Sequence, residues 1–451
     1  MFVAVYGRRR VGKTYLIRET FNNRFTFYHT GLAKSTMSKQ LAAWRLSLRE
    51  YGLKKATLPR TWLDAFDDLK EIIRQSDEKK KIIFIDELPW MDTQRSGFIP
   101  ALENFWNGWA SARKDVVLVV CGSATSWIIN KILKNKGGLH NRVNTKIHLQ
   151  PFTLHECERY AAHRKLVMNR RQIMECYMIM GGIPFYWSKL ERGISMAQNI
   201  DNLFFNPDGE LHDEFDELYA SLFKNPDPYI TVVQTLGKKR TGMTRDEIIA
   251  AGGLQDNGRL SEILQDLEAC GFIRRYSNFG LKSKQAVFQL IDSYTLFHYR
   301  FIQENRGGDE NFWSRQTGSP LYYNWCGLAF ERLCLLHLPQ VKEALGILGT
   351  VSRVCSWYQT STPERKGVQI DLIVDRDDGV IDLCEMKYTK EPYEMTSEEE
   401  QKIQYRRSSL ITATGTEKAV HLVLISANGV KENAYSDEFQ SIITADALFE
   451  G

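Results

Sequence analysis

Two short stretches near the start of the sequence combine residue types that handle phosphate. An apolar run at residues 2–6 leads into GRRRVGKT, which fits the pattern G-x-x-x-x-G-K-[ST] at every fixed position. Glycines let backbone N–H groups surround phosphate oxygens, lysine supplies a point charge, and a threonine hydroxyl can ligate Mg²⁺. The helix predicted after the loop adds its positive N-terminal end. The residues expected to bind a nucleotide are Gly7, Arg8, Arg9, Arg10, Val11, Gly12, Lys13 and Thr14.

The second stretch is KIIFIDE, residues 81–87. A continuous apolar run suits a strand that is buried on both faces of a parallel sheet. At its carboxyl end, Asp86 is expected to hold Mg²⁺ through water, and Glu87 to polarise an attacking water. An ordinary buried strand ending in a solvated acidic turn is the alternative. The loop and the acidic strand, in this order, predict a site for ATP and Mg²⁺.

A separate set of charged residues lies near the end of the chain. Two strand-like runs, VQIDLIV and VIDLCEMK, place Asp371 on one strand and Glu385 and Lys387 on the next. Two carboxylates can hold Mg²⁺ at a scissile phosphate, and the ammonium can position or deprotonate water. Glu331, an isolated acid in an apolar helix, is a candidate to complete the metal site. The alternative is a hairpin with charged edges, because the pattern D…ExK is short and common.

The turn between these two strands decides whether the second site can form. A three-residue loop at 377–379 opposes Asp371 to Glu385, whereas a two-residue loop turns Glu385 away. The longer loop needs a positive φ at its last residue, which Gly379 supplies. We therefore predict the three-residue loop, with Asp371, Glu385 and Lys387 on one face of the sheet.

Composition places the chain among ordinary globular proteins. It has 451 residues, of which 43% are hydrophobic and 25% charged, so two to four domains are expected. No apolar run approaches the length of about 18 residues that spans a bilayer, and no secretory leader is recognisable. Eight scattered cysteines without a Cys-x-x-Cys pair indicate buried thiols. We expect a cytoplasmic location and no membrane partner.

Charge is unevenly distributed along the chain. Residues 1–60 contain thirteen Lys and Arg against two Glu, a balance of +11, whereas the remainder is −7. The run Arg8, Arg9 and Arg10 exceeds what a phosphate loop requires. These arginines could also face nucleic acid or an acidic neighbour, and a solvated basic face is the alternative.

Strands alternate with helical patterns through the first 150 residues. Residues 25–28, 116–121 and 147–149 read as further strands, and a doubly wound parallel α/β sheet is therefore expected. Ser123 follows the strand at 116–121. A polar side chain there would sense the γ-phosphate if this strand lies between the loop strand and the acidic strand, and a simple strand-end turn is the alternative. The predicted domains are 1–150 (P-loop ATPase core), 151–215 (helical lid), 216–300 (winged helix) and 301–451 (α/β nuclease-like domain).

The winged-helix prediction rests on two short helices followed by a β-like pair, with Lys282 and Lys284 at the tip between the strands. DNA binding by the second helix is one interpretation. However, Glu262, Asp266 and Glu268 on that helix would repel phosphates, which favours a structural or interdomain role.

Taken together, the motifs resemble those of prokaryotic archaeal-type P-loop ATPases of the AAA+/STAND class that carry a PD-(D/E)xK nuclease-like C-terminal domain. The motifs that carry the resemblance are GRRRVGKT, IIFIDELPW, CGSATSW, GGIP, WCGLAFE, QIDLIVD and CEMKY. It implies that Asp371, Glu385 and Lys387 match the nuclease core and Glu331 its helical acid. It also implies that Pro184 lies near the nucleotide, and that Arg142 senses phosphate in cis or in trans.

The resemblance leaves two functions open. Relatives usually have a Gly-Arg-containing segment before the first strand that helps to hold the base, and this sequence starts at the strand. Either the start is truncated or base recognition is looser, so adenine selection is less defined than phosphate binding. The first function is an ATPase that controls a metal-dependent DNA nuclease. The second is an ATP-driven switch that only binds DNA or protein, with a vestigial nuclease site. A third function, a P-loop kinase for small molecules, fits the sequence poorly because of the Asp86-Glu87 pair and the long C-terminal region. The expected partners are ATP and DNA, with a homo-oligomer as a further option.

Overall fold

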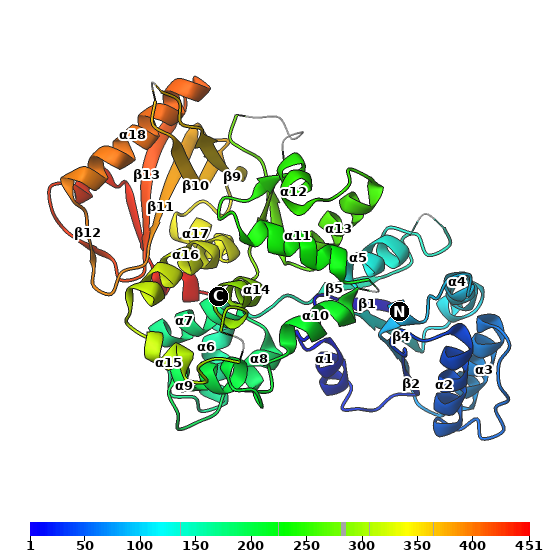
Figure 1. Ribbon diagram of the computed structural model, residues 1–451. Coiled ribbons are helices and arrows are strands. Elements are labelled where there is room, and N and C mark those ends of the chain that lie inside the picture. The colour runs from blue at the N-terminus through cyan, green and yellow to red at the C-terminus, as the bar shows by residue number, and fades with distance from the viewer. Residues whose placement is uncertain (136, 224, 281–285, 306, 364) are drawn as a thin grey trace. The chain divides into compact units, whose positions relative to one another are not determined.

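The computed structural model describes residues 1–135, 137–223, 225–280, 286–305, 307–363 and 365–451 (Figure 1). These residues form two compact units. The first contains residues 1–151, 216–229 and 261–270, and the second contains 152–215, 230–260 and 271–451. Within the described ranges, no helix combines the length and apolar character needed to cross a membrane. All eight cysteines are buried thiols, as the sequence predicted.

The first unit is built on a parallel five-stranded sheet with the order β2-β3-β4-β1-β5. β4 therefore lies between β1, which precedes the phosphate loop, and β3, which ends in Asp86. This confirms the added strand on which the Ser123 prediction depends. The strands are β1 (Phe2–Tyr6), β2 (Phe27–Thr30), β3 (Lys81–Asp86), β4 (Val116–Gly122) and β5 (Thr145–His148).

Helices cover both faces of this sheet, which explains why its central strands are apolar throughout. On one face, side chains of β1, β3 and β4 pack with α2, α3 and α4, where Trp44, Trp62 and Phe66 are fully buried. On the other face, Val3, Val5 and Phe84 form a cluster with Ile17 of α1. The helices are α1 (Lys13–Thr20), α2 (Met37–Glu50), α3 (Trp62–Gln75), η1 (Leu88–Trp90), α4 (Phe98–Gly108), η2 (Ala110–Ala112), α5 (Thr125–Trp127) and η3 (Ile128–Leu133).

Three helices have residues assigned to both units: α10 (Glu214–Leu222), α11 (Asp227–Gly237) and α13 (Gly258–Ala269). The second unit begins with the helices predicted for 151–215, whose role as a lid stays a prediction. They are α6 (Leu154–His163), α7 (Arg170–Met180), α8 (Pro184–Ser188), α9 (Met196–Ile200) and η4 (Asp201–Phe205). Further along lie α14 (Ser293–Phe297), η6 (His298–Ile302), α15 (Phe312–Gln316), α16 (Pro320–Leu336) and α17 (Leu338–Ala344).

A small antiparallel sheet with the order β6-β8-β7 follows α11. It comprises β6 (Met243–Thr244), β7 (Ile273–Tyr276) and β8 (Val287–Leu290), and α12 (Arg245–Gly252) starts directly after β6. The β-like pair predicted at 272–276 and 286–291 is confirmed as β7 and β8. Lys282 and Lys284 lie outside the described residues, and the winged-helix assignment stays a prediction.

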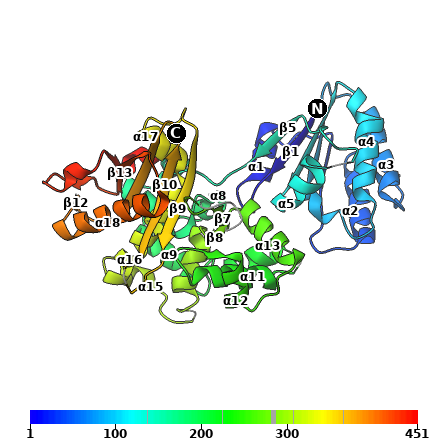
Figure 2. The same ribbon diagram turned by 90° about the horizontal axis from the view of Figure 1, so that it is seen from above.

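The C-terminal part of the second unit is a mixed five-stranded sheet with the order β15-β13-β11-β10-β9 (Figure 2). β9, β10 and β11 are antiparallel, whereas β11, β13 and β15 are parallel. α18 packs on one face through Ile403 and Leu410. α16 packs on the opposite face, where Cys334 lies close to Cys384 of β11. The elements are β9 (Ser352–Gln359), β10 (Val368–Arg376), β11 (Val380–Lys387), β12 (Tyr393–Glu394), α18 (Ser397–Thr414), β13 (Ala419–Ser426), β14 (Val430–Lys431), η7 (Ser436–Glu438), β15 (Ser441–Thr444) and η8 (Ala445–Phe449).

Candidate nucleotide site and C-terminal carboxylates

The loop from Gly7 to Thr14 turns the chain from β1 into α1. Gly7 has φ 149°, and a Cβ there would lie 2.2 Å from the carbonyl oxygen of Leu149. Gly12 has φ 89° and is the N-cap residue of α1, a backbone conformation that side-chain-bearing residues rarely adopt. Arg10 adopts φ 71° between them. Glycine is therefore required at position 7 by a close backbone approach and at position 12 by the turn into the helix.

Lys13 is the cation that this loop presents. Its side chain is buried, and its ammonium donates to the carbonyl oxygens of Gly7 at 3.0 Å and Arg8 at 2.8 Å. A buried ammonium needs acceptors to offset its lost hydration. The loop carbonyls supply them here, and phosphate oxygens are suited to do so because they are anionic.

Thr14 and Asp86, each of which the sequence predicts to lie at Mg²⁺, are in direct contact. The Thr14 hydroxyl donates to Asp86 Oδ2 at 2.7 Å, and Asp86 Oδ1 accepts from the Glu87 N–H at 2.9 Å. Asp86 is buried at the end of β3. A hydroxyl and a carboxylate are oxygen ligands of the kind that Mg²⁺ prefers, so this pair fits the metal that accompanies a nucleotide.

Glu87 and Ser123 complete the line of contacts. The Ser123 hydroxyl, at the end of β4, lies 3.2 and 3.1 Å from the two carboxylate oxygens of Glu87. Glu87 has φ 47° at the start of η1. Burial raises the pKa of Glu87 and the charge of Asp86 raises it further, while Lys13 and the Ser123 hydrogen bond oppose the shift. A carboxylate with a raised pKa is a stronger base, which suits activation of water.

The remaining loop residues have separate environments. Arg10 forms an ion pair at 3.1 Å with Glu217 of α10, which is the acidic neighbour that the sequence left open. Arg8 and Val11 are buried, and Arg9 is partly exposed.

The resemblance assigns Arg142 and Pro184 roles at the nucleotide. Arg142 is exposed just before β5, and Pro184 is the first residue of α8 in the second unit. Their roles stay predictions.

Gln40 is a positioning residue that the sequence analysis missed. It is fully buried, and its amide nitrogen donates to the carbonyl oxygens of Leu32 at 2.6 Å and Trp90 at 2.9 Å. Its amide oxygen accepts from the Leu32 N–H at 3.0 Å. It thereby joins the loop after β2 to η1, which carries Glu87 at its start. A glutamine in a helical pattern gives no sequence signal for such a role.

The hairpin of β10 and β11 has the predicted register. Leu372 pairs with Cys384 and Asp375 with Ile381, so the three residues 377–379 form the loop. Gly379 has the positive φ expected, at 86°. The prediction of a three-residue loop is confirmed.

The prediction that Asp371 and Glu385 share one face is wrong, because β10 contains a bulge at its pairing with β9. Ile370 pairs with Trp357 and Ile373 with Cys355, so Asp371 and Leu372 together oppose one residue. Ile370 and Ile373 both pack in the core under α18. The extra residue breaks the alternation of faces. Asp371 is consequently turned towards α16.

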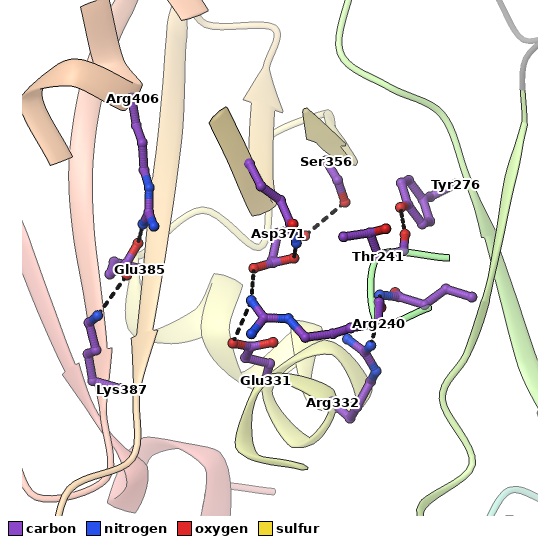
Figure 3. A network of polar contacts seen from close by, with 12 residues as sticks. Arg240, Thr241, Tyr276, Glu331, Arg332, Ser356, Asp371, Glu385, Lys387 and Arg406 are labelled. Atoms are coloured by element: carbon purple, nitrogen blue, oxygen red, sulfur yellow. Dashed lines mark hydrogen bonds and ion pairs between the residues drawn. The ribbon is translucent and has the colours of Figure 1, made fainter. Parts of the chain in front are cut away.

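All three carboxylates are paired with cations (Figure 3). Arg240 bridges Glu331 at 3.3 Å and Asp371 at 3.2 Å. On the α18 face, Glu385 is held by Lys387 at 3.0 Å and by Arg406 of α18. The expected metal set of Glu331, Asp371 and Glu385 is therefore not assembled, and the described residues contain no group of three or more suitable side chains that could hold a metal ion.

Glu331 is largely shielded from solvent, with a side chain that is 12% exposed. Burial, followed by the charge of Asp371, raises its pKa to about 7, while Arg240 and Arg332 oppose the shift. Arg240 and Arg406 were not anticipated, because Arg240 lies 131 residues from Asp371 in the chain and neither arginine belongs to a motif.

The sheet order and the line of contacts from Thr14 to Ser123 define an α/β unit that resembles P-loop ATPases. Residues 1–190 match the model of a family described as an ATPase domain predominantly from Archaea. This match supports nucleotide binding by the loop. An uncharacterised protein of Methanocaldococcus jannaschii is 23% identical over 383 residues, which are 83% of this chain and 80% of that protein.

Two solved structures are also similar. A Walker-type ATPase of Pyrococcus abyssi has 16% identity and a TM-score of 0.45, covering 66% of this chain and 91% of that one. The ORC2 protein of Aeropyrum pernix, in ADPNP–ADP complexes, has 12% identity and a TM-score of 0.35, covering 68% of this chain and 89% of that one.

Proposed function

We propose that the first unit binds and hydrolyses MgATP, and that the chain acts as an ATP-driven switch. The observation that carries this proposal is the continuous series of side-chain and backbone contacts Thr14–Asp86–Glu87–Ser123, adjoining Lys13. These residues are the set that phosphoryl transfer requires: a cation, a metal-binding pair, a base and a polar sensor.

Each residue has a distinct role in this proposal. Lys13 binds the β- and γ-phosphates. Thr14 and Asp86 would hold Mg²⁺, which supplies charge stabilisation to the phosphates when bound. Glu87 orients the attacking water and accepts its proton, since burial strengthens it as a base. Ser123 holds Glu87 in place. Because Glu87 acts at the γ-phosphate in this proposal, Ser123 beside it would sense whether that phosphate is bound.

A switch is favoured over a nuclease by the C-terminal sheet. A shared metal needs Asp371 and Glu385 on one face, whereas the bulge turns them to opposite faces. Arg240 neutralises one carboxylate, and Lys387 and Arg406 neutralise the other. Positioning water beside a metal would require Lys387 and Asp371 on the same side. These contacts favour the switch, in which the nuclease site of the C-terminal sheet is vestigial.

DNA is the partner that we propose for the switch. The support is the positive balance of residues 1–60, whose cations outside the loop are mostly exposed. Such a surface attracts phosphate backbones without sequence preference. The exposed cations are Arg18, Arg24, Lys34, Lys39, Arg49, Lys54, Lys55 and Arg60. Arg142 is exposed as well, and in a homo-oligomer it would be available to a neighbouring nucleotide.

The test compares two variants of the full chain. Lys13→Ala should lose ATP binding, because the phosphates lose their main cation. Glu87→Gln should bind ATP and turn over at least 100-fold more slowly, because an amide cannot accept the proton. Both are measured by nucleotide binding and by phosphate release, with and without duplex DNA. Wild-type turnover in Glu87→Gln would refute the role of Glu87 as the base, and the absence of phosphate release by the wild-type chain would refute hydrolysis. An ATPase rate and a conformation that do not respond to DNA would refute DNA as the partner. If the chain cleaves DNA with Mg²⁺ and Asp371→Ala abolishes this cleavage, the nuclease function would replace the switch.

A further inference from the structure

A cavity of about 510 Å³ lies within the second unit and shares no residue with the nucleotide site. It is lined by the end of α11 and the loop after it, by α14 and η6, and by α16. Small-molecule sites in proteins commonly have volumes of about 300–1,000 Å³. The cavity is therefore large enough for a ligand of nucleotide size rather than a single small ion.

The described residues that line the cavity are rich in cations. Lys238, Arg240, Arg300 and Arg332 contribute positive charge, and Glu304 is the one carboxylate among them. Arg240 is engaged by Glu331 and Asp371. Even without Arg240, three cations face one acid, so the cavity favours an anion.

Arg332 is the least expected of these residues. Only 4% of it is exposed, and one of its terminal nitrogens donates to the backbone carbonyl of Arg240 (Figure 3). Its Nε and its other terminal nitrogen have no hydrogen-bond partner among the described residues. Burial lowers its pKa, although Glu331 and Asp371 support its charge. A buried guanidinium with unused donors is costly unless an acceptor is supplied.

The cavity also has an aromatic and apolar side. Trp325 is buried with its ring packed on Phe297 and Phe301, at centroid distances of 5.6 and 5.4 Å. Its indole nitrogen likewise has no acceptor among the described residues. Leu296 and Leu328 line the cavity nearby. A ligand that fits both sides carries a strong anion on a flat or apolar body.

We propose that this cavity binds an organic phosphate of mononucleotide size. Nε and Nη1 of Arg332 are the unused donors, and each can bind a phosphate oxygen. A phosphate carries up to two negative charges and so matches the three cations better than a carboxylate with one. Lys238 and Arg300, both exposed, stand at the rim and draw the anion in. The aromatic base or another apolar body lies against Trp325 and the leucines. The site is independent of ATP hydrolysis by the first unit.

The test uses the full chain carrying Lys13→Ala, so that the phosphate loop does not contribute. Titration calorimetry is performed with AMP, adenosine, inorganic phosphate, and a short oligonucleotide with and without a 5′-phosphate. AMP should bind at one site per chain, and adenosine at least 10-fold more weakly. Inorganic phosphate should bind more weakly than AMP because it lacks the aromatic base that would contact Trp325 and the leucines. Binding of the 5′-phosphorylated oligonucleotide alone would overturn the mononucleotide ligand and assign the phosphate to a nucleic-acid end.

Variants at the cavity provide the matched comparison. Arg332→Gln should weaken AMP binding at least 10-fold. If it fails to fold, Lys238→Gln with Arg300→Gln at the exposed rim should weaken binding about 3- to 10-fold. Lys239→Gln is the control, because Lys239 pairs with Glu247 at 2.6 Å and does not line the cavity. Equal affinity for AMP and adenosine, equal weakening by Lys239→Gln and the rim variants, or no binding by any phosphate would overturn the proposal.

Discussion

The hydroxyl of Ser123, at the end of β4, contacts both carboxylate oxygens of Glu87, at the end of β3. The single O–H of Ser123 is shared between these oxygens and favours the ionised form of Glu87, so it limits the rise in the pKa of Glu87 that burial and Asp86 cause. Ser123 consequently affects the protonation of the proposed base as well as its position.

Ser123→Ala tests this relationship through the pH dependence of ATP turnover. Removing the donor should raise the pKa of Glu87 further, so that it becomes protonated at higher pH. The acidic limb of the pH–rate profile should then move to higher pH, with turnover reduced most at low pH and partly recovered at high pH. Ser123→Thr, which keeps the hydroxyl, should leave the limb in place. A uniform reduction at every pH would show that Ser123 does not act through Glu87.

Gly7→Ala tests the close approach of the loop to the residue that follows β5. The added Cβ would lie 2.2 Å from the Leu149 carbonyl oxygen, which belongs to the backbone and cannot rotate away. We expect a loss of stability of about 2–3 kcal/mol and strongly weakened nucleotide binding, because the loop must shift.

The matched control for this substitution is Gly12→Ala. That position also has positive φ, but no heavy atom lies within 4 Å of the point that an added Cβ would occupy, so only the backbone strain of about 1–2 kcal/mol applies. Thermal unfolding and nucleotide titration measure both effects. Equal losses in the two variants would show that the contact with Leu149 is unimportant.

Gln40→Leu tests whether the buried amide supports the loop that carries Glu87. The substitution leaves the carbonyls of Leu32 and Trp90 and one N–H without their partner. We expect a loss of stability of at least about 3 kcal/mol, because three groups lose their partner and each unsatisfied buried group costs about 1–3 kcal/mol. ATP turnover should be slower at unchanged phosphate affinity. Gln75→Leu, at the exposed end of α3, should change stability by less than about 0.5 kcal/mol. Denaturant unfolding and steady-state kinetics distinguish the two.

Glu331→Gln tests the pKa of about 7 assigned to the buried acid. The folded state holds this proton more tightly than the unfolded chain does, whose value is near 4.5. The contribution of this proton to the free energy of unfolding is therefore fully present below pH 4.5 and is lost as pH rises through about 7. The loss amounts to at most about 3 kcal/mol. In Glu331→Gln this loss should be absent, so its stability relative to the wild type should improve as pH rises across that interval. A constant difference between pH 5 and 8 would contradict the raised pKa.

Local chemistry determined what the sequence could predict. GRRRVGKT and KIIFIDE specify a loop, a helix start and a buried strand from neighbouring residues, and the line from Thr14 to Glu87 follows once parallel strands share an edge. The hairpin register followed from pairing parity together with Gly379 at the last loop position, because a turn type sets the pairing of both strands.

The rest depends on partners that are distant in the chain. The bulge at Asp371 exists in the pairing of β10 with β9, so no count within the motif reveals it. Arg240 reaches Glu331 and Asp371 from a loop that has no motif of its own. Gln40 and Arg332 are buried polar residues whose sequence surroundings read as ordinary helix. Such contacts arise from tertiary packing, which residue spacing does not record.

The bulge in β10 has a consequence for protein design. Because Asp371 faces α16 together with Leu372, the position on β11 that shares its side is the partner of Leu372, namely Cys384, and not Glu385. A carboxylate engineered at 384 would be directed towards Glu331 and Asp371, and three acids would then converge where Arg240 now pairs with two. A motif search counts residues along the chain, whereas a metal site on a sheet requires side chains that point to the same face. Reprogramming this sheet into a metal centre would therefore begin at Cys384, one residue away from the glutamate that the motif designates.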